Sequence, residues 1–413
     1  MKAVVFNLGC KVNQYESDKI AEELAKIGYE VSEELVFADV YVLNTCAVTA
    51  EAERKSRQAV ARCRALNNAA KVFVCGCASQ KSATLFEKDN VYYVAGATNK
   101  QSILNHLEDE SFSSDVVDLP DKYDDEGILS SANRTRAYVK IQDGCNSFCS
   151  YCIIPYLRGR SRSRAIEDIV KEVSVLSEKT SEIVLTGINI MSYGSDIGTN
   201  LTELIKALRE FDVRIRLGSF YAEGITEELL DALFSLKKFC PHFHLSLQSG
   251  DKRVLKDMNR HYTPEIYEEK INLIRRYDKN ACIATDVIVG FPTETEESHE
   301  NTVEFIKKVG FSDIHVFPFS SREGTRAAKL KQLSPEVIKR RRDEMLALKE
   351  ELRNKYLKEN VGVKQSVLIE EKIDDYYCGY SQYYIRIYLK RGAESEIAES
   401  TPSVLYKDGL LEE

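Results

Sequence analysis

The sequence contains no apolar run of 18 residues, and this absence excludes an ordinary membrane-spanning helix. Its first residues, MKAVVFNLGCKVN, are interrupted by Asn7 and Lys11 too early for the apolar segment of a signal peptide. We therefore expect a cytoplasmic protein with no membrane partner. A chain of 413 residues is long enough for two or three domains, because single hydrophobic cores stop growing near ~250 to 300 residues.

Histidine is scarce as well, with six residues in the whole chain, and no Ser-His-Asp set can be recognised among them. Cysteine is present in an odd number, eleven, without an export signal, so a disulfide framework is not expected. Reduced thiols or metal ligands are favoured instead. His242 and His244 fall on one expected strand and could line a cavity, although histidines packed in a core or at its rim are the commoner case.

The sequence also has no excess of basic residues, because its net charge is −8. The excess of acid is local, because residues 107–127 hold nine Asp or Glu and one Lys, which is also a net charge of −8. The remaining chain is therefore neutral, and it includes a basic segment at 336–360 with the pattern of an amphipathic helix. The overall acidity does not exclude RNA as a partner.

The first hundred residues alternate strand-like and helix-like segments, a pattern typical of a doubly wound parallel sheet, and we assign residues 1–106 to this N-terminal domain. Three of its expected strands, AVVFNLG, DVYVLNT and KVFVCG, are followed by Cys10, Cys46 and Cys77. The carboxyl ends of parallel strands meet at one edge, so we expect the three thiols to meet there. Cys75 is a rival ligand, because a spacing of two residues would place it on the same strand face as Cys77.

The acidic segment at 107–130 has the composition of a linker. After it, six strand-like segments alternate with helical patterns over residues 131–335, fewer than the eight units of a closed barrel, so we expect an open, partial (β/α)6 barrel. The basic helix at 336–360 connects this barrel to short strands at 361–413, which we expect to form a small all-β domain. The fold class is thus α/β with a C-terminal all-β domain.

Cys145, Cys149 and Cys152 follow directly after the first expected barrel strand, in the sequence DGCNSFCSYC. Thiolates select zinc or iron-sulfur clusters. A structural zinc site needs four protein ligands, and no fourth Cys or His lies nearby in the sequence. Three ligands suit a four-iron cluster with one iron open to a substrate or cofactor, while zinc remains the alternative.

This spacing, with Tyr151 before the last cysteine, resembles the radical S-adenosylmethionine superfamily. Together with NLGCKVNQYES, VLNTCAVT, VCGCASQ and the run that ends in RGRSRSR, it resembles the methylthiotransferase family over essentially the whole chain. The resemblance includes residues 361–413, which are similar to an RNA-binding TRAM domain. The wording GCKVNQYES is most similar to the enzymes that act on N6-threonylcarbamoyladenosine beside the tRNA anticodon.

The resemblance implies two four-iron clusters and S-adenosylmethionine as cofactors. The radical cluster would be held by Cys145, Cys149 and Cys152, and the auxiliary cluster by Cys10, Cys46 and Cys77. One S-adenosylmethionine would donate a methyl group to sulfur, and another would yield a radical that removes hydrogen from adenine C2, a bond beyond the reach of acid-base catalysis. A reductant protein and a sulfur donor are implied as partners.

Further cofactor contacts are expected where barrel strands end. Hydrogen bonds to S-adenosylmethionine are expected from Asn189, Gln248, Ser249 and Gly290, and Ile154 would pack on its adenine. Each of these residues also has a purely structural alternative.

Four arginines follow the cysteine triplet at every second position: Arg158, Arg160, Arg162 and Arg164. If this segment is extended, all four share one side, because side chains in a strand alternate with a period of two. Such a strip would grip phosphates and guide a tRNA anticodon stem-loop toward the cluster. The alternative is that some of these arginines pair with acidic residues elsewhere in the chain.

The main hypothesis is an enzyme that adds a methylthio group to C2 of N6-threonylcarbamoyladenosine in tRNA. Related alternatives are methylthiolation of isopentenyladenosine in tRNA or of an aspartate in a ribosomal protein. A remote alternative is a non-catalytic metal-binding protein that binds RNA.

Overall fold

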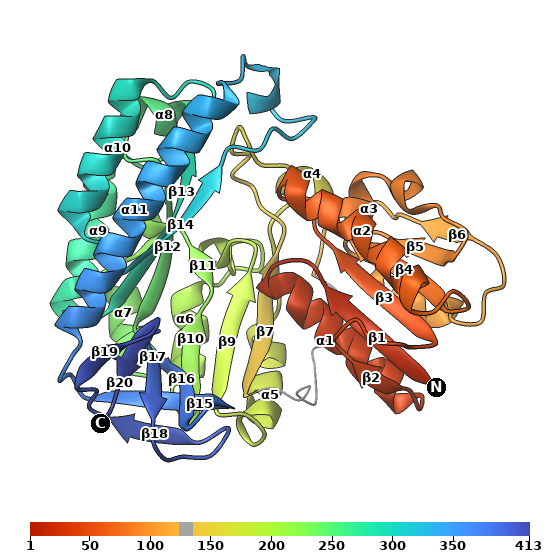
Figure 1. Ribbon diagram of the computed structural model, residues 1–413, viewed down its shortest axis with the longest axis horizontal. Helices are drawn as coiled ribbons and strands as arrows, with labels where there is room; N and C mark the ends of the chain where they lie inside the picture. Colours follow the sequence, from red (N-terminus) through yellow and green to blue (C-terminus); the bar gives the residue numbers. More distant parts are fainter. Residues whose placement is uncertain (124–134) are drawn as a thin grey trace.

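The computed structural model describes residues 1–123 and 135–413. The end of the expected linker, 124–130, and the first residues of the expected barrel region, 131–134, lie outside the described residues. Three parts follow one another along the chain, namely a parallel sheet with helices, an incomplete barrel and a small, largely antiparallel sheet (Figure 1). Among the described residues, no helix is long and apolar enough to cross a membrane.

The first sheet has parallel strands in the order β2-β1-β3-β4-β5-β6. These are β1 (Lys2–Asn7), β2 (Glu30–Ser32), β3 (Val40–Thr45), β4 (Lys71–Gly76), β5 (Val91–Ala95) and β6 (Ser113–Asp115). One face is covered by α1 (Lys11–Lys26) and the 3-10 helix η2 (Lys100–His106), and the other by α2 (Ala50–Leu66), α3 (Cys77–Lys81) and η1 (Ala83–Phe86). The expected doubly wound sheet is confirmed. Strand β6 lies inside the segment expected to be a linker, because pairing with β5 uses backbone groups and tolerates acidic side chains.

The central part is an open barrel with six positions of parallel strands. They are occupied by β7 (Arg136–Asp143), β9 (Glu182–Gly187), β10 (Arg214–Leu217), β12 (His242–Gln248), β13 (Cys282–Val289) and β14 (Asp313–Pro318), with β8 (Arg162–Ser163) and β11 (Ser219–Phe220) beside them. Ile215 of β10 forms an isolated bridge with Phe239, which lies just before β12, and β10 and β12 are in contact. Within the described residues β7 and β14 do not pair, so the barrel is partial, as expected, and α1 packs along β7.

Helices connect the barrel strands and bury the outer faces of the sheet. They are α4 (Ile154–Arg158), α5 (Ile166–Ser177), η3 (Ile190–Ser192), α6 (Leu201–Ala207), η4 (Ala222–Gly224), α7 (Glu227–Phe234), α8 (Lys252–Asp257), α9 (Pro264–Tyr277), α10 (Glu296–Val309) and η5 (Ala327–Lys329). Helix α10 shows how the local sequence determines where such a helix begins and ends. The hydroxyl of Thr295 accepts a hydrogen bond from the N–H of Ser298, and Gly310 ends the helix in the left-handed region. Val303 and Ile306 then place its apolar face in the barrel core.

Helix α11 (Pro335–Glu359) packs along β14 and leads into the C-terminal sheet. The strands of this sheet are β15 (Gln365–Ile373), β16 (Tyr376–Ser381), β17 (Arg386–Leu389), β18 (Ile397–Ser400), β19 (Val404–Tyr406) and β20 (Gly409–Leu411). Their order is β18-β15-β16-β17-β20-β19. The expectation of an all-β C-terminal part is confirmed.

The C-terminal sheet covers the amino ends of the barrel strands, which we call the barrel floor (Figure 1). Arg216 of β10 donates hydrogen bonds to the carbonyl oxygens of Ser381 (3.1 Å) and Gln382 (3.3 Å). The ring of Tyr384 stacks on His242, the first residue of β12, with centroids 4.4 Å apart. The barrel is therefore covered at the end opposite the cysteine loop, which follows the carboxyl end of β7.

Candidate active site

Three strand-end cysteines of the first sheet lie at one edge of it. Cys10 precedes α1 after β1, Cys46 follows β3, and Cys77 begins α3 after β4, and these strands are neighbours in the sheet. The pKa of the Cys46 thiol is raised to about 11, mainly by burial and in smaller part by nearby Cys77 and Cys10. The structure therefore brings these three thiols together at the carboxyl edge of the sheet.

Cys77 is positioned by a turn that requires glycine. Gly76 has a φ of 109°, and a Cβ at this position would lie 2.4 Å from the carbonyl oxygen of Thr45. Helix α3 begins at Cys77 directly after this turn. The alternation of side chains between the two faces of the strand has therefore already ended at Cys77. Cys75 packs in the core on the α1 side of the sheet with Val5, whereas Cys77 belongs to the core on the other side. The expectation that the two cysteines share one face is wrong.

The cysteine loop after β7 is folded back on itself. The N–H of Cys152 donates to the carbonyl oxygen of Cys149 at 3.0 Å, and the side chain of Asn259 donates to the carbonyl oxygen of Ser147 at 3.0 Å. The pKa of the Cys152 thiol is raised to about 12, mainly by burial and in smaller part by nearby Cys149 and Cys145. The three thiols of this loop are therefore neighbours as well.

Two buried arginines direct N–H groups at cysteine sulfurs. Nε of Arg158 lies 3.4 Å from Sγ of Cys77, and Nη1 of Arg260 lies 3.4 Å from Sγ of Cys149. A cationic donor favours the thiolate form that binds iron. Sequence reasoning missed both roles, and Arg260, which is 111 residues from Cys149, carries no motif that could have revealed it.

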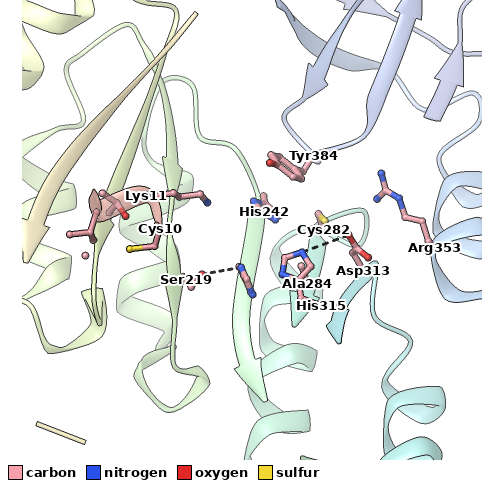
Figure 2. A pocket seen from close by; sticks show the side chains of 14 residues that line it. Cys10, Lys11, Ser219, His242, Cys282, Ala284, Asp313, His315, Arg353 and Tyr384 are labelled. Carbon is pink, nitrogen blue, oxygen red and sulfur yellow. Dashed lines mark hydrogen bonds and ion pairs between the residues drawn. The ribbon is translucent and has the colours of Figure 1, made fainter. Parts of the chain in front are cut away.

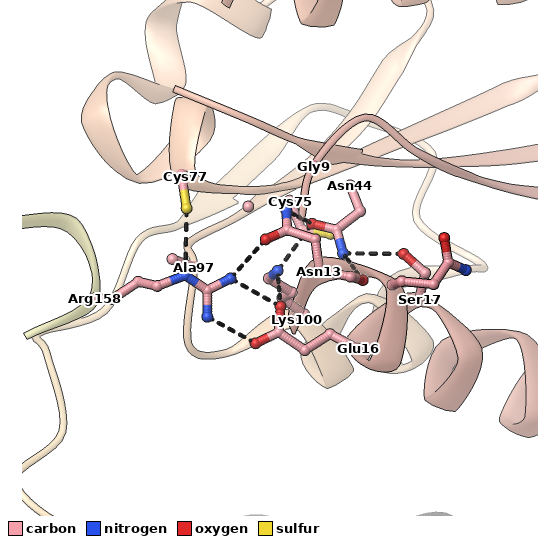
Figure 3. Close-up of polar contacts among 12 residues, drawn as sticks. Gly9, Asn13, Glu16, Ser17, Asn44, Cys75, Cys77, Ala97, Lys100 and Arg158 are labelled. Atoms are coloured by element: carbon pink, nitrogen blue, oxygen red, sulfur yellow. Dashed lines mark hydrogen bonds and ion pairs between the residues drawn. The ribbon is translucent and has the colours of Figure 1, made fainter. Parts of the chain in front are cut away.

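Arg158 connects the segment after the cysteine loop to the first sheet, and Figure 3 shows its contacts with Cys77, Asn13 and Glu16. Its fully buried guanidinium donates to Glu16 (2.9 and 3.0 Å) and Asn13 (2.8 Å) of α1, and to Asp143 (3.1 Å) at the end of β7. Burial alone would raise the pKa of the Glu16 carboxyl, but Arg158 and neighbouring lysines hold this pKa well below its usual value. Because α4 also packs against α3, one side chain ties the loop after β7 to the edge of the first sheet.

The four alternating arginines do not form one basic strip. Arg158 lies in helix α4 and not in an extended segment, so the period of two fails at its start. Arg162 is buried against Asp143 (3.2 Å), and Arg164 is buried against Glu172. The prediction of a phosphate-binding strip is therefore wrong for these three arginines, because each compensates a buried carboxylate.

Arg160 is the exposed arginine of this segment. Its guanidinium lies over the ring of Phe148, 4.6 Å from the centroid, and so sits beside the cysteine loop. A contact between Arg160 and a phosphate stays a prediction.

Two of the residues expected to contact the cofactor, Asn189 and Gln248, have features typical of a ligand-binding site. Within the described residues, Oδ1 of Asn189 is buried without a hydrogen-bond partner. Gln248 has a left-handed backbone, with a φ of 69°, where the pairing of β12 with β13 is irregular. An orphaned buried acceptor and a strained residue are features of a site that a ligand completes.

Ser249, Gly290 and Ile154 are engaged within the protein. The hydroxyl of Ser249 hydrogen-bonds that of Thr302 (3.2 Å), and the N–H of Gly290 donates to Glu294 (2.7 Å). Ile154 packs against the core of the first sheet. The hydroxyl of Ser249 and the N–H of Gly290 thus already have partners, and contacts of these three residues with S-adenosylmethionine stay a prediction.

A cavity of about 340 Å³ lies inside the barrel and reaches from Cys10 to the floor (Figure 2). His242 and His244 both line it, which is the less common of the two positions that the sequence allowed for these histidines. Nε2 of His244 lies 2.8 Å from Oδ1 of Asp286, and Nδ1 of His315 lies 3.3 Å from the same oxygen. The cavity reaches from one cysteine of the first sheet to this group of polar side chains, and its size is that of a site for small ligands.

The number of thiols in each set distinguishes a zinc ion from a cluster. A structural zinc site is closed by four protein ligands. Three thiolates instead suit a four-iron core with one iron left open. A separate group of metal-binding side chains, His244, Asp286 and His315, has all its ligand atoms within 4.8 Å of one another.

Known proteins share this arrangement of motifs. Residues 2–96 match the uncharacterized protein family UPF0004, and residues 139–306 match the radical SAM superfamily. The threonylcarbamoyladenosine tRNA methylthiotransferase of Aquifex aeolicus is 40% identical over 386 residues, which are 90% of this chain and 93% of the relative. The chain belongs to the radical S-adenosylmethionine methylthiotransferase family. The tRNA-2-methylthio-N(6)-dimethylallyladenosine synthase of Thermodesulfovibrio yellowstonii is 36% identical to this methylthiotransferase over 385 residues, 89% of this chain and 87% of the relative.

A solved structure shows the same fold at low sequence identity. It is a radical S-adenosylmethionine methyltransferase from Kitasatospora setae with cobalamin and a [4Fe-4S] cluster bound. It aligns with a TM-score of 0.54 and 14% identity over 77% of this methylthiotransferase and 72% of the neighbour. This likeness concerns the fold alone and agrees with the α/β fold class.

Enzymes of this family use two four-iron clusters and S-adenosylmethionine, and the residues present fit these groups. The loop cysteines after β7 would hold the radical cluster, and the strand-end cysteines of the first sheet would hold the auxiliary cluster. When bound, these groups supply the radical and the transferable sulfur that side chains lack. The methylthiotransferase itself gathers the thiols, directs Arg158 and Arg260 at two of them, and provides a cavity that begins at Cys10.

Replacing Arg260 by methionine is expected to make the reduction potential of the radical cluster more negative by about 40 mV, which is about 1 kcal/mol for one electron. The physical reason is that a cationic N–H donor at Cys149 stabilises the more negative, reduced cluster. A redox titration followed by electron paramagnetic resonance measures this potential. Arg276→Met, an exposed arginine of α9, is the control, and an unchanged potential in an iron-replete Arg260→Met protein would contradict the role of Arg260.

Proposed function

We propose that this methylthiotransferase attaches a methylthio group to C2 of N6-threonylcarbamoyladenosine next to the tRNA anticodon. The observation that carries the proposal is the 40% identity, over 90% of the chain, with the Aquifex aeolicus enzyme named for this nucleoside. The cavity beside Cys10 supports it, because a base from an RNA loop can be turned out into such a chamber.

Isopentenyladenosine in tRNA is the second candidate substrate. The Thermodesulfovibrio yellowstonii relative, named for the dimethylallyl nucleoside, is 36% identical over 89% of the chain, a value close to that of the first relative. The two nucleosides differ in chemistry, since one carries a charged carboxylate on N6 and the other carries an apolar chain.

Mass spectrometry of tRNA nucleosides distinguishes these candidates. A bacterial strain without its own tRNA methylthiotransferases, expressing this chain, is expected to contain 2-methylthio-N6-threonylcarbamoyladenosine. The Cys145→Ala variant is the matched control and is expected to leave the nucleoside unmodified. The appearance of methylthiolated isopentenyladenosine alone would favour the second candidate, and modification of a ribosomal protein without any change in tRNA would refute both.

The proposal includes RNA contacts by Arg160 and by the TRAM-like domain at 361–413. In that domain Lys407 lies over the rings of Tyr388 (5.8 Å) and Tyr406 (5.4 Å). The ring of Tyr376 packs beside that of Tyr406, with centroids 5.3 Å apart. Half-exposed rings such as Tyr376 and Tyr406 offer surfaces on which unpaired bases stack.

Replacing Arg160 by glutamate is expected to weaken tRNA binding and to reduce the slope of log affinity against log salt by about 1, because one phosphate contact is lost. Filter binding at several salt concentrations measures both quantities. Arg209→Glu, an exposed arginine after α6, makes the same change of charge away from the cysteine loop and is expected to bind tRNA almost normally. Equal binding by the parent and Arg160→Glu proteins at every salt concentration would remove Arg160 from the RNA-binding surface.

The proposed reaction consumes electrons and sulfur. We therefore include a reductant protein and a sulfur donor among the partners of the enzyme, and place all of them with tRNA in the cytoplasm.

A further inference from the structure

Lys11 places an unpaired positive charge in the barrel cavity. It is the first residue of α1, directly after Cys10, and Figure 2 shows its side chain extending toward His242. Within the described residues, its half-buried ammonium group forms no ion pair and no hydrogen bond. Lys100, another lysine of the site, is buried against Glu16. Withdrawing an ammonium group from water without an anion is costly, so the position of Lys11 calls for a negatively charged ligand.

The groups behind Lys11 do not supply that anion. The nearby carboxylate of Glu182 already pairs with three arginines of the barrel floor, Arg136 (3.1 Å), Arg214 (3.0 Å) and Arg216 (2.8 Å). A second carboxylate, Glu370 of the C-terminal sheet, pairs with one of the same arginines at 2.9 Å. Lys11 and these three arginines thus outnumber the two carboxylates. The region between Lys11 and the barrel floor therefore has an excess of positive charge.

Two further groups of the cavity are available to an anionic ligand. Nδ1 of His242 is buried without a hydrogen-bond partner in the described part of the chain. Arg353 of α11 lines the opposite wall, and its guanidinium lies 6.0 Å from the centroid of the Tyr356 ring. The single carboxylate in the wall near Arg353, that of Asp313, is already paired with Lys349 at 3.3 Å.

We infer that Lys11 binds the carboxylate of the threonine group on the substrate nucleoside. This inference rests on the proposed function and names the residue that selects its substrate. In N6-threonylcarbamoyladenosine, the ureido N–H can close a hydrogen-bonded ring with N1 of adenine, which directs the carboxylate to the edge that also carries C2. C2 has to approach the cysteine set that includes Cys10, and Lys11 is the next residue in the chain.

The same charge opposes an apolar N6 substituent. An isopentenyl group would occupy the cavity without neutralising Lys11, so the ammonium would stay half-buried without an anion. Lys11 thereby favours one substrate and disfavours the other through a single interaction.

The test compares two synthetic anticodon stem-loops, one with N6-threonylcarbamoyladenosine and one with its methyl ester, which has the same shape and no charge. The parent enzyme is expected to prefer the acid over the ester by about 30-fold in kcat/KM, because the ester leaves a desolvated cation unpaired. The Lys11→Gln variant is expected to lose most of this preference, and Lys11→Arg is expected to retain part of it. The acid-to-ester ratio is taken within each protein, so partial loss of clusters does not affect it.

Lys26→Gln is the control, because this exposed lysine ends the same helix and its change of charge is identical. It is expected to keep the ratio of the parent. A ratio that stays near 30 in an iron-replete Lys11→Gln protein, or a parent enzyme that modifies acid and ester equally well, would overturn the inference alone. Failure of the parent enzyme to modify the acid stem-loop would overturn the proposed function and the inference together.

Discussion

Replacement of Cys10 or Cys145 by alanine is expected to halve the iron bound by the reconstituted methylthiotransferase and to abolish methylthiolation of tRNA. Each cluster depends on three thiols with no spare protein ligand, so loss of one thiol releases one four-iron cluster, and the iron content falls from about eight to about four per chain. The two variants should differ in what remains. Cys10→Ala keeps the loop cysteines and is expected to cleave S-adenosylmethionine under strong reductant, whereas Cys145→Ala is expected to produce no 5′-deoxyadenosine.

Cys75→Ala is the matched control for this experiment. Cys75 is fully buried on the α1 side of the first sheet, whereas Cys77 lies on the other side, so Cys75 is not placed to bind the cluster. This variant is expected to keep the iron content and the activity of the parent. An unchanged iron content in Cys10→Ala, or a halved content in Cys75→Ala, would overturn the assignment of the ligands.

Replacement of Arg158 by methionine is expected to lower the free energy of unfolding by about 3 to 5 kcal/mol, because it leaves buried carboxylates without their cation. The side chains concerned are Glu16, within 3.0 Å of the guanidinium, and Asp143, at 3.1 Å. Because the same guanidinium also donates to Cys77, methylthiolation is expected to fall by more than the loss of folded protein explains. Denaturation by urea measures the first effect, and product formed per iron-replete enzyme measures the second.

Arg160→Met is the control for the loss of stability in Arg158→Met, because it removes an arginine that is not part of the buried network. Arg160 lies two residues further along the same segment but is exposed, so its replacement is expected to change the free energy of unfolding by less than about 0.5 kcal/mol. If Arg158→Met unfolds at the same urea concentration as Arg160→Met, the buried network does not stabilise the contact between the first sheet and the barrel.

The strand-end cysteines could be found from the sequence because chain order and parallel pairing determine where each strand ends. Cys46 and Cys77 could be placed at one edge of the sheet without any information about tertiary contacts. The barrel followed from the same kind of regularity, since six strand patterns alternate with helices. Cys75 was misplaced by one step of that reasoning, because the turn at Gly76 ends the strand before the alternation reaches Cys77.

The arginines could not be assigned in this way, because their surroundings come from distant parts of the chain. Arg158 is 142 residues from Glu16, and no periodicity within a segment reports an ion pair of that range. The same limit applies to Arg260 and Lys11. The sulfur of Cys149 beside Arg260, and the absence of an anion beside Lys11, can be recognised only in the three-dimensional structure.

The stacking of Tyr384 on His242 closes the cavity toward the C-terminal sheet. A nucleoside is therefore expected to approach from the opposite end of the barrel, where the cysteine loop follows β7. Enlarging the C-terminal sheet would then leave this approach free.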